Sequence, residues 1–290
     1  MLATLSALPD SVQAILLGII EGITEFLPIS STGHLLVAEH WLGARSELFN
    51  IAIQAGAILA VVFIYWRKLW ALALAFLGRR DMIDPDTGTI LQVGDARAYV
   101  MKLIGAFAVT AIGGLLVKKF GWELPKEARP IAWAFIIGAV WMVAAEWMSA
   151  RQAQRIGQRT EVSWLTAILV GVAQLVAGVF PGTSRSAATI FIALITGTTS
   201  RVAATEFAFL VGIPTMFAAT AYDLLKVLKS GEAVHENWSA LGIAFVVSMI
   251  TAFIAVKWLL RYIQSHRFTA FALYRVVLGV ALLLLLPAAS

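Results

Sequence analysis

The feature that most constrains this chain is a set of apolar segments long enough to cross a membrane. The hydrocarbon core of a bilayer is about 30 Å thick, and a helix needs roughly 20 residues to cross it. Six segments meet that length, and they lie near 47–66, 96–118, 130–149, 200–222, 238–260 and 268–288. A helix satisfies its own backbone hydrogen bonds, as a span in lipid must. The sequence therefore predicts an all-α integral membrane protein with six transmembrane helices.

The composition agrees with that prediction and excludes several functions. Apolar residues make up 60% of the chain and charged residues 13%, with a mean hydropathy of +0.85. Soluble domains are about half apolar and about a quarter charged. The apolar composition persists along the whole chain, so we expect a single polytopic domain over residues 1–290. The chain has no cysteine, which excludes disulfides, thiolate metal sites and cysteine nucleophiles. The net charge of +5 is modest, and nucleic acid is not an expected partner.

Two further apolar stretches, 12–27 and 164–180, are too short to span and each is followed by a proline. A run of Ser, Thr and Gly comes next, and then a second short apolar piece, 35–42 or 187–195. A helical arm of this length reaches only about 24 Å at about 1.5 Å per residue. We therefore predict two re-entrant helical hairpins. Irregular backbone at membrane depth is tolerated only where it is buried in protein or lines a wet cavity, so both turns are candidate sites.

The two hairpins resemble each other in sequence. A gap-free shift of 153 residues superimposes Gly18 on Gly171, Glu21 on Gln174, Pro28 on Pro181 and Ser31 on Ser184. This divides the chain into repeat one, about 11–149, and repeat two, about 162–288. Each unit contains three spans, so the second must enter the membrane from the opposite side. The pattern predicts an inverted repeat with a site near the midplane. The alternative is a chance similarity between two stretches rich in Gly, Pro and Ser.

The first turn contains two acidic residues in an apolar setting. Glu21 and Glu25 are four residues apart, so they share one face of a helix. A charge at membrane depth costs at least a few kcal/mol, and two carboxylates also repel each other. A divalent cation, a basic partner or a shared proton would offset that cost. The alternative is a solvated pair at a wet helix end.

Hydroxyl residues follow the proline of this turn. We expect Ser30, Ser31 or Thr32 to cap the next helix by accepting a backbone N–H. The free N–H groups and the positive end of the helix dipole form a natural anion site. His34 would lie in the first turn of that helix, where it could act as general acid or base or hold a phosphate oxygen. A purely structural histidine is the alternative.

The second turn contains one isolated cation. Arg185 is the only charged residue between Glu161 and Arg201, and it lies where a helix begins again. Its planar fork of donors suits a phosphate group. Further hydroxyl donors are expected from Ser184, Ser186 and Thr189. The alternative is that Arg185 only neutralises Glu21 or Glu25, and that pairing would itself join the two turns.

These two turns resemble the motifs of the undecaprenyl-diphosphate phosphatase family, the bacitracin-resistance type. The family motif Glu-Gly-x-Thr-Glu-Phe-Leu-Pro-x-Ser-Ser-Thr-Gly-His matches at every named position from Glu21 to His34. Its later motif Pro-Gly-x-Ser-Arg-Ser matches from Pro181 to Ser186. Residues 53–61, 206–216 and 274–275 extend the resemblance over nearly the whole chain. The sequence departs from the family at Ala187, where the family usually has Gly.

The resemblance implies a multi-pass enzyme of the bacterial inner membrane, with its active site facing the periplasm. It implies hydrolysis of undecaprenyl diphosphate to the monophosphate, which recycles the lipid carrier for cell-wall synthesis and gives bacitracin resistance. A divalent cation, Mg²⁺ or Ca²⁺, is implied as cofactor. The functional positions carried over from the motifs are Glu21, Glu25, Ser31, His34, Ser184, Arg185 and Thr189. The expected partners are a prenyl diphosphate lipid and membrane lipid, and a homodimer is left open.

Our hypothesis for the mechanism is in-line displacement at the terminal phosphorus. Glu21 and Glu25 would hold the cation, and Arg185 would clamp the phosphate oxygens with help from neighbouring hydroxyls. The nucleophile is either Ser31, which we favour, or a water activated by Glu25 or His34. The alternatives are a membrane transporter or lipid flippase, which also uses inverted repeats, and the acid-phosphatase type of lipid phosphatase. The latter needs a His six residues after its Arg, and Phe191 occupies that position.

Overall fold

The computed structural model of this protein is helical apart from one small hairpin. It describes residues 7–78, 81–83, 88, 90–120, 128–230 and 236–285. The elements in that part of the chain are α1 (Asp10–Thr24), α2 (Ser31–Leu42), α3 (Glu47–Phe76), β1 (Met82–Ile83), β2 (Ile90–Leu91), α4 (Val93–Lys119), α5 (Ala128–Ile156), α6 (Trp164–Val179), α7 (Arg185–Ile195), α8 (Arg201–Ser230), α9 (Trp238–Ser265) and α10 (Thr269–Leu285).

Five of the described helices are long and apolar enough to cross a membrane, namely α3, α4, α5, α8 and α9. Each begins within about three residues of a predicted span, which confirms the all-α membrane class. Several continue further than predicted, and α3 runs on to Phe76. The sixth predicted span, 268–288, corresponds to α10, which has 17 residues and counts among the shorter apolar helices. The last three residues of that prediction lie outside the described residues.

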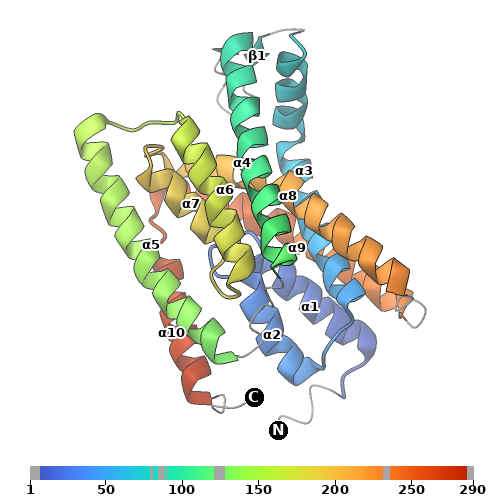
Figure 1. The fold of residues 1–290 in the computed structure, drawn as a ribbon. Coiled ribbons are helices and arrows are strands. Elements are labelled where there is room, and N and C mark those ends of the chain that lie inside the picture. Colours follow the sequence, from blue (N-terminus) through green and yellow to red (C-terminus); the bar gives the residue numbers. More distant parts are fainter. Residues whose placement is uncertain are drawn as a thin grey trace.

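The connection between α3 and α4 contains the one sheet in the described residues. Strands β1 and β2 pair antiparallel, with Met82 opposite Leu91. Figure 1 shows α3 and α4 rising side by side beyond the other helices, with β1 at their shared end. Arg97 Nε donates to the Phe76 carbonyl at 3.0 Å and joins the two helices there. The all-α prediction missed this pairing because strands of two residues are too short for an alternating pattern.

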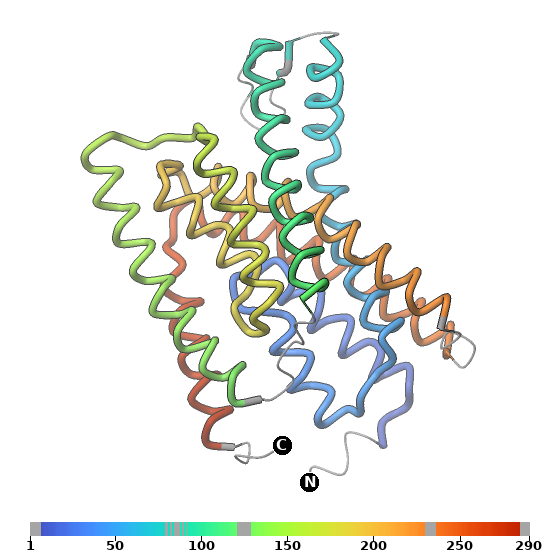
Figure 2. Tube along the Cα trace, viewed as in Figure 1, coloured from blue at the N-terminus to red at the C-terminus, as the bar shows by residue number. Residues whose placement is uncertain are grey.

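The predicted short arms are present as two pairs of helices, α1 with α2 and α6 with α7. They have 15, 12, 16 and 11 residues, all fewer than a membrane span needs. Helix α2 begins at Ser31, earlier than the predicted apolar piece, because its Ser-Thr-Gly sequence forms the first helical turn. In Figure 2 the blue α1–α2 pair and the yellow α6–α7 pair approach each other near the middle of the molecule.

The first arm of each pair packs against a long helix from the other half of the chain. Helix α1 lies against α9, and α6 lies against α4. A Cβ added at Gly18 would come within 2.7 Å of the Ala244 carbonyl, and one added at Gly171 within 2.5 Å of the Ala106 carbonyl. The backbone carbonyls of these two glycines also accept hydrogen bonds from threonine hydroxyls. Thr251 donates to Gly18 at 3.4 Å, and Thr110 donates to Gly171 at 2.9 Å. The two halves therefore make equivalent close contacts, of the kind that small residues permit between membrane helices.

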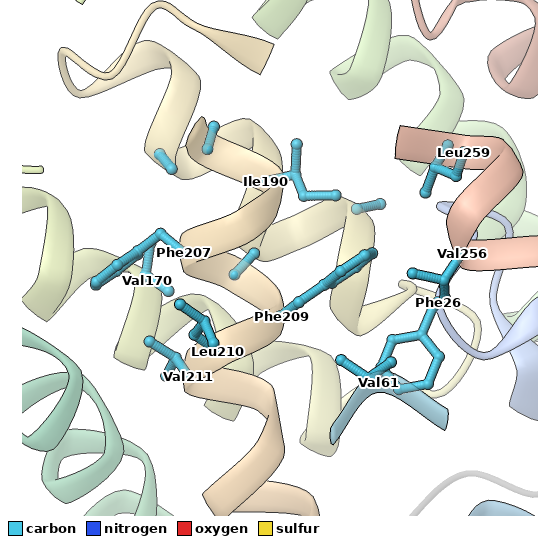
Figure 3. Packing of buried hydrophobic residues seen from close by; sticks show 14 of the residues in the cluster. Phe26, Val61, Val170, Ile190, Phe207, Phe209, Leu210, Val211, Val256 and Leu259 are labelled. Carbon is cyan, nitrogen blue, oxygen red and sulfur yellow. The ribbon is translucent and has the colours of Figure 1, made fainter. Parts of the chain in front are cut away.

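The main core cluster reaches the end of α1. Phe26 is buried, and its ring meets the Phe209 ring of α8 edge to face, with centroids 5.3 Å apart. Figure 3 shows these two rings among Val61 of α3 and Val256 of α9. Edge-to-face pairs add to the stabilisation that burial alone provides. The residue after Glu25 is thus anchored in the core, which fixes where the first turn begins.

Candidate active site

The two predicted turns meet through an ion pair. Arg185, the first residue of α7, donates from Nη2 to Oε1 of Glu25, which follows α1 directly. The side chain of Glu25 is 3% exposed and that of Arg185 is 27% exposed. A charge buried to this degree requires a partner. The expected meeting of the two hairpins at a shared centre is therefore confirmed.

The second oxygen of Glu25 is also engaged. Ser31 Oγ donates to Glu25 Oε2, and both residues are buried. Glu25 thus accepts from a hydroxyl on one oxygen and from a guanidinium on the other. A nucleophile bonded to a base, which is itself held by a third group, is the usual arrangement for activating a hydroxyl. Here the three groups come from the end of α1, the start of α2 and the start of α7.

The backbone of both turns is strained at the residue before the second helix. Among the described residues, the only non-glycine residues with positive φ are Ser30, at 73°, and Ser184, at 66°. Such conformations cost free energy and concentrate at functional sites. The turns therefore correspond at Ser30 and Ser184, one residue away from the predicted match of Ser31 with Ser184. The reason is that the second loop has one residue more between its proline and its helix.

The cap predicted for the helix after the first turn is absent, whereas the helix after the second turn has one. Ser184 Oγ accepts from the Ala187 N–H at 3.3 Å and caps α7. Helix α2 begins without a side-chain cap from its N-cap residue, Ser30, and Ser31 donates to Glu25. The first N–H groups of a helix have no partner within the helix. At α2 these donors remain available to an anion.

Side chains also fasten one turn to the other. Ser186 Oγ donates to the Leu27 carbonyl at 2.9 Å and lies 3.2 Å from Ser184 Oγ. Of the predicted hydroxyl donors, Ser186 therefore links the two hairpins. The Thr189 hydroxyl donates to the Arg185 and Ser186 carbonyls, at 2.9 and 3.1 Å, within its own helix. The hydrogen bonds of the Thr189 hydroxyl are therefore made within α7.

Arg275 of α10 links both turns to α5. Arg275 is 0% exposed, so its guanidinium lies wholly inside the protein. Nη2 donates to the Gly182 carbonyl at 2.9 Å, and Nη1 donates to the Pro28 carbonyl at 3.5 Å. Further bonds reach α5 at the carbonyls of Ala134 and Phe135. The planar fork of donors in one guanidinium thereby holds three segments together.

His34 lies beside the first turn and has defined partners. Its Nδ1 donates to the Ser30 carbonyl at 2.7 Å, which leaves Nε2 to accept from the Tyr274 hydroxyl, also at 2.7 Å. The ring stacks on Tyr274 and meets Phe135 edge on. His34 therefore supports the strained residue Ser30, and its predicted role as acid or base stays a prediction.

The centre of the site is a cavity of about 190 Å³ between the two turns and α3. Four predicted residues of the first turn (Glu25, Ser30, Ser31, Thr32) and two of the second (Ser184, Arg185) line it. The remaining lining residues are Gln54, Ala177, Gly178, Pro181 and Gly182. Gln54 was absent from the predicted site. Its signal in the sequence was an amide in an otherwise apolar span, a kind of residue that often marks function.

Glu21 and Glu25 fit the oxygen ligands that a divalent cation prefers. Glu21 is 2% exposed, and its Oε2 has no hydrogen-bond partner among the described residues. A buried carboxylate oxygen without a protein partner requires a proton, a water or a cation. Mg²⁺ usually takes one or two carboxylates and completes its shell with water and substrate phosphate. No cluster of three or more His or acidic residues occurs in the described part of the chain, so protein groups alone would leave such a shell incomplete.

The fold and the site define a helical membrane protein with a buried serine, carboxylate and guanidinium centre between two short helical hairpins. Its sequence matches the family described as bacitracin resistance protein BacA over residues 14–281. The chain belongs to that family. It is 62% identical over 274 residues to a protein of Rhizobium johnstonii named undecaprenyl-diphosphatase, covering 94% of this chain and 96% of that one. A Xanthomonas oryzae pv. oryzae protein of the same name is 55% identical over 281 residues, covering 97% and 99%.

Proposed function

We propose that this protein hydrolyses undecaprenyl diphosphate to undecaprenyl monophosphate and inorganic phosphate, and so recycles the lipid carrier for cell-wall synthesis and confers resistance to bacitracin. The observation that carries this proposal is the junction of Ser31, Glu25 and Arg185 at one cavity. A hydroxyl, a carboxylate and a guanidinium lie within reach of one another there, which supports the roles of nucleophile, base and phosphate-binding fork. The names of the related proteins agree with that chemistry.

We propose that the site lies at membrane depth in the bacterial inner membrane and faces the periplasm. In this arrangement α10 is the sixth span, and the α1–α2 and α6–α7 pairs are re-entrant hairpins of an inverted repeat. The equivalent contacts of Gly18 with α9 and Gly171 with α4 support the repeat. Helix α10 has 17 residues, which is the short end of the usual range for a transmembrane helix. The prenyl tail would then extend sideways into lipid.

Substrate binding is expected to change the partners of Arg185. A guanidinium has five N–H donors, and the bond to Glu25 uses only Nη2. A terminal phosphate in the cavity would accept from the remaining donors, from Ser184 and from the open N–H groups at the start of α2. As the phosphate draws Arg185 away, Oε1 of Glu25 loses its guanidinium partner, while Oε2 still accepts from Ser31. Thr32 and Ser30 line the same wall and add donors at its edge.

In the reaction that we favour, Ser31 is the nucleophile. Its Oγ attacks the terminal phosphorus and forms an O–P bond, while the bond to the bridging oxygen breaks. The hydroxyl proton moves to Glu25, and undecaprenyl monophosphate leaves with the electron pair. Water then hydrolyses the phosphoserine and releases inorganic phosphate. A water activated directly by Glu25 or His34 is the alternative.

Glu21 and Glu25 would hold the divalent cation, Mg²⁺ or Ca²⁺. When bound, it would neutralise charge on the diphosphate and so favour departure of the monophosphate. The unpartnered Oε2 of Glu21 supports this assignment. In this chain, Arg185 supplies the positive charge near the transferred phosphate, and the strained turns set the positions of Ser31 and Ser184.

Phosphate release from a long-chain prenyl diphosphate by the purified protein tests the proposal. We expect the wild type to release phosphate, chelation of divalent cations to reduce the rate, and Glu25→Gln to reduce it by about 100-fold or more. Recovery of a phosphoserine peptide containing Ser31 would favour the serine mechanism, and its absence during turnover would favour water. A wild type that moves the lipid across vesicles but releases no phosphate would contradict the proposal and favour a flippase.

A further inference from the structure

Gln54 is the one residue lining the cavity that belongs to neither hairpin. The other lining residues come from the ends of α1 and α6, the starts of α2 and α7, or the turns between them. Gln54 lies in α3, so it adds a third segment of the chain to the lining of the cavity. An amide in an apolar span is costly unless its polar atoms are used. Its position at the cavity therefore requires an explanation.

The orientation of the Gln54 amide is set from α8. Thr220 Oγ1 donates to Gln54 Oε1 at 3.3 Å, and Thr220 is buried. This hydrogen bond directs the amide oxygen toward α8. An amide also has two N–H donors on nitrogen. Within the described residues, no protein partner is found for Gln54 Nε2.

The backbone that carries Gln54 is also held in place. Ser248 of α9 donates from Oγ to the Ile53 carbonyl at 2.7 Å, and both residues are fully buried. Helix α3 is thus fixed by α9 next to Gln54, while the side chain is fixed by α8. A donor held from two sides loses little conformational entropy when it binds a ligand.

We propose that Gln54 donates from Nε2 to a phosphate oxygen of the substrate, and that Thr220 acts as a positioning residue for it. This inference rests on the proposed function and adds to it a substrate contact outside both motif turns. Gln54 lines the same cavity as Arg185 and Ser31, so the diphosphate would be held by α3 as well as by the two turns. A neutral donor suits this wall because Arg185 already supplies positive charge.

The first test compares variants of Gln54 for phosphate release from a prenyl diphosphate. We expect Gln54→Ala to lower kcat/KM by about tenfold to a hundredfold, as for loss of one hydrogen bond to a charged group. Gln54→Glu keeps the size of the side chain but removes both donors and adds negative charge, so it should lower kcat/KM further. Values of kcat/KM within about twofold of wild type for both variants would overturn the proposal.

The second test asks whether Thr220 acts through Gln54. Thr220→Val removes the hydroxyl, and we expect a loss of about threefold to tenfold in kcat/KM. The loss should vanish in the Gln54→Ala background, because no amide remains to be oriented. Thr215→Val is the matched control on the same helix, since the Thr215 hydroxyl donates to the Val211 carbonyl of its own helix. Equal losses from the two threonine variants, or losses that simply add, would overturn the positioning role.

A binding arm separates this inference from the proposed hydrolysis. A prenyl methylene-diphosphonate, which cannot be hydrolysed, is titrated against wild type and Gln54→Ala in detergent. We expect Gln54→Ala to bind it about tenfold to a hundredfold more weakly. If Gln54→Ala binds the analogue more weakly but the wild type releases no phosphate from the diphosphate, hydrolysis is refuted and the Gln54 contact stands. Equal binding by the two proteins, with normal phosphate release, would refute the contact and keep hydrolysis.

Discussion

Glu25 illustrates how a single residue of this site depends on its partners. Its carboxylate is almost fully buried and accepts from Ser31 on one oxygen and from Arg185 on the other. Without the guanidinium, the charge would be buried and unpaired, which is strongly destabilising. The same pairing keeps the guanidinium at the cavity, where we propose that it binds phosphate. Arg185 can therefore both neutralise the charge of Glu25 and bind phosphate.

Two substitutions of Arg185 separate its effect on activity from its effect on folding. Arg185→Ala should lower turnover of a prenyl diphosphate by about 100- to 1000-fold, as for loss of a donor to developing charge. Arg185→Lys keeps a positive charge beside Glu25 but loses the planar fork. We expect its thermal unfolding midpoint to stay within a few degrees of wild type while turnover still falls at least about tenfold. Wild-type turnover by the lysine variant would contradict the need for a fork.

The positive φ of Ser30 gives a prediction about stability. Glycine adopts φ near 73° without strain, so Ser30→Gly should change the free energy of unfolding by less than about 1 kcal/mol. Ser30→Val places a β-branched side chain in the same backbone conformation and should lower the free energy of unfolding by about 1–3 kcal/mol. Denaturant unfolding in detergent measures both. Equal values for the two variants would mean that the turn is not strained at this residue.

The short helices were predictable as elements, while their ends were not. Proline and the hydroxyl run in each turn identified both breaks, and the apolar arms identified the helices that flank them. The start of α2 at Ser31 was missed, because hydroxyl residues favour turns, caps and first helical turns alike. The missing cap at α2 was not predicted either, because three adjacent hydroxyl residues could each have capped that helix.

The close contact between α1 and α9 makes a prediction at the level of helices. Gly18→Ala would place a methyl group 2.7 Å from the Ala244 carbonyl, so α1 must move away from α9. We expect a loss of about 1–3 kcal/mol in stability and a fall in turnover, because α1 carries Glu21 and leads to Glu25. The measurements are thermal unfolding in detergent and phosphate release.

Gly242→Ala is the matched control for that prediction. It lies in α9, and a Cβ added there meets nothing within 4 Å. The same substitution should therefore be neutral or slightly stabilising, because alanine favours helix by about 1 kcal/mol over glycine. A Gly18 variant as stable and active as the Gly242 variant would show that the two helices can adjust without cost.

At the scale of the whole molecule, the site exists because distant segments converge. Arg275, near the end of the chain, donates to the carbonyls of Pro28 and Gly182 in the two turns and to α5. Replacing it with methionine would fill a similar volume but leave these buried carbonyls without a donor. Each such loss costs about 1–3 kcal/mol. The two turns would then keep only their direct bonds, from Arg185 to Glu25 and from Ser186 to Leu27, although neither turn has changed in sequence.

We therefore expect Arg275→Met to lower both the unfolding midpoint and turnover, and Arg275→Lys to restore little of either. A lysine offers a point charge with three donors and cannot span both turns as the fork does. Thermal unfolding and phosphate release in the same detergent measure the two effects. An Arg275→Met protein with normal stability and turnover would contradict the linking role.

The sequence by itself determined the membrane class, the long helices, the two broken hairpins and the acidic and basic residues of both turns. Those features are local, because hydropathy, helix breaks and residue type each depend only on residues that are close together in the sequence. Only the tertiary structure decided that Glu25 accepts from both Ser31 and Arg185, that His34 bonds to Ser30 and Tyr274, and that the Thr189 hydroxyl bonds within α7. It also decided that Gln54 lines the cavity and that Arg275 links the two turns. These relations depend on which face of a helix meets which carbonyl after packing. A hydrogen bond is decided by a shift of about 1 Å, and the spacing of residues in a sequence does not carry that information.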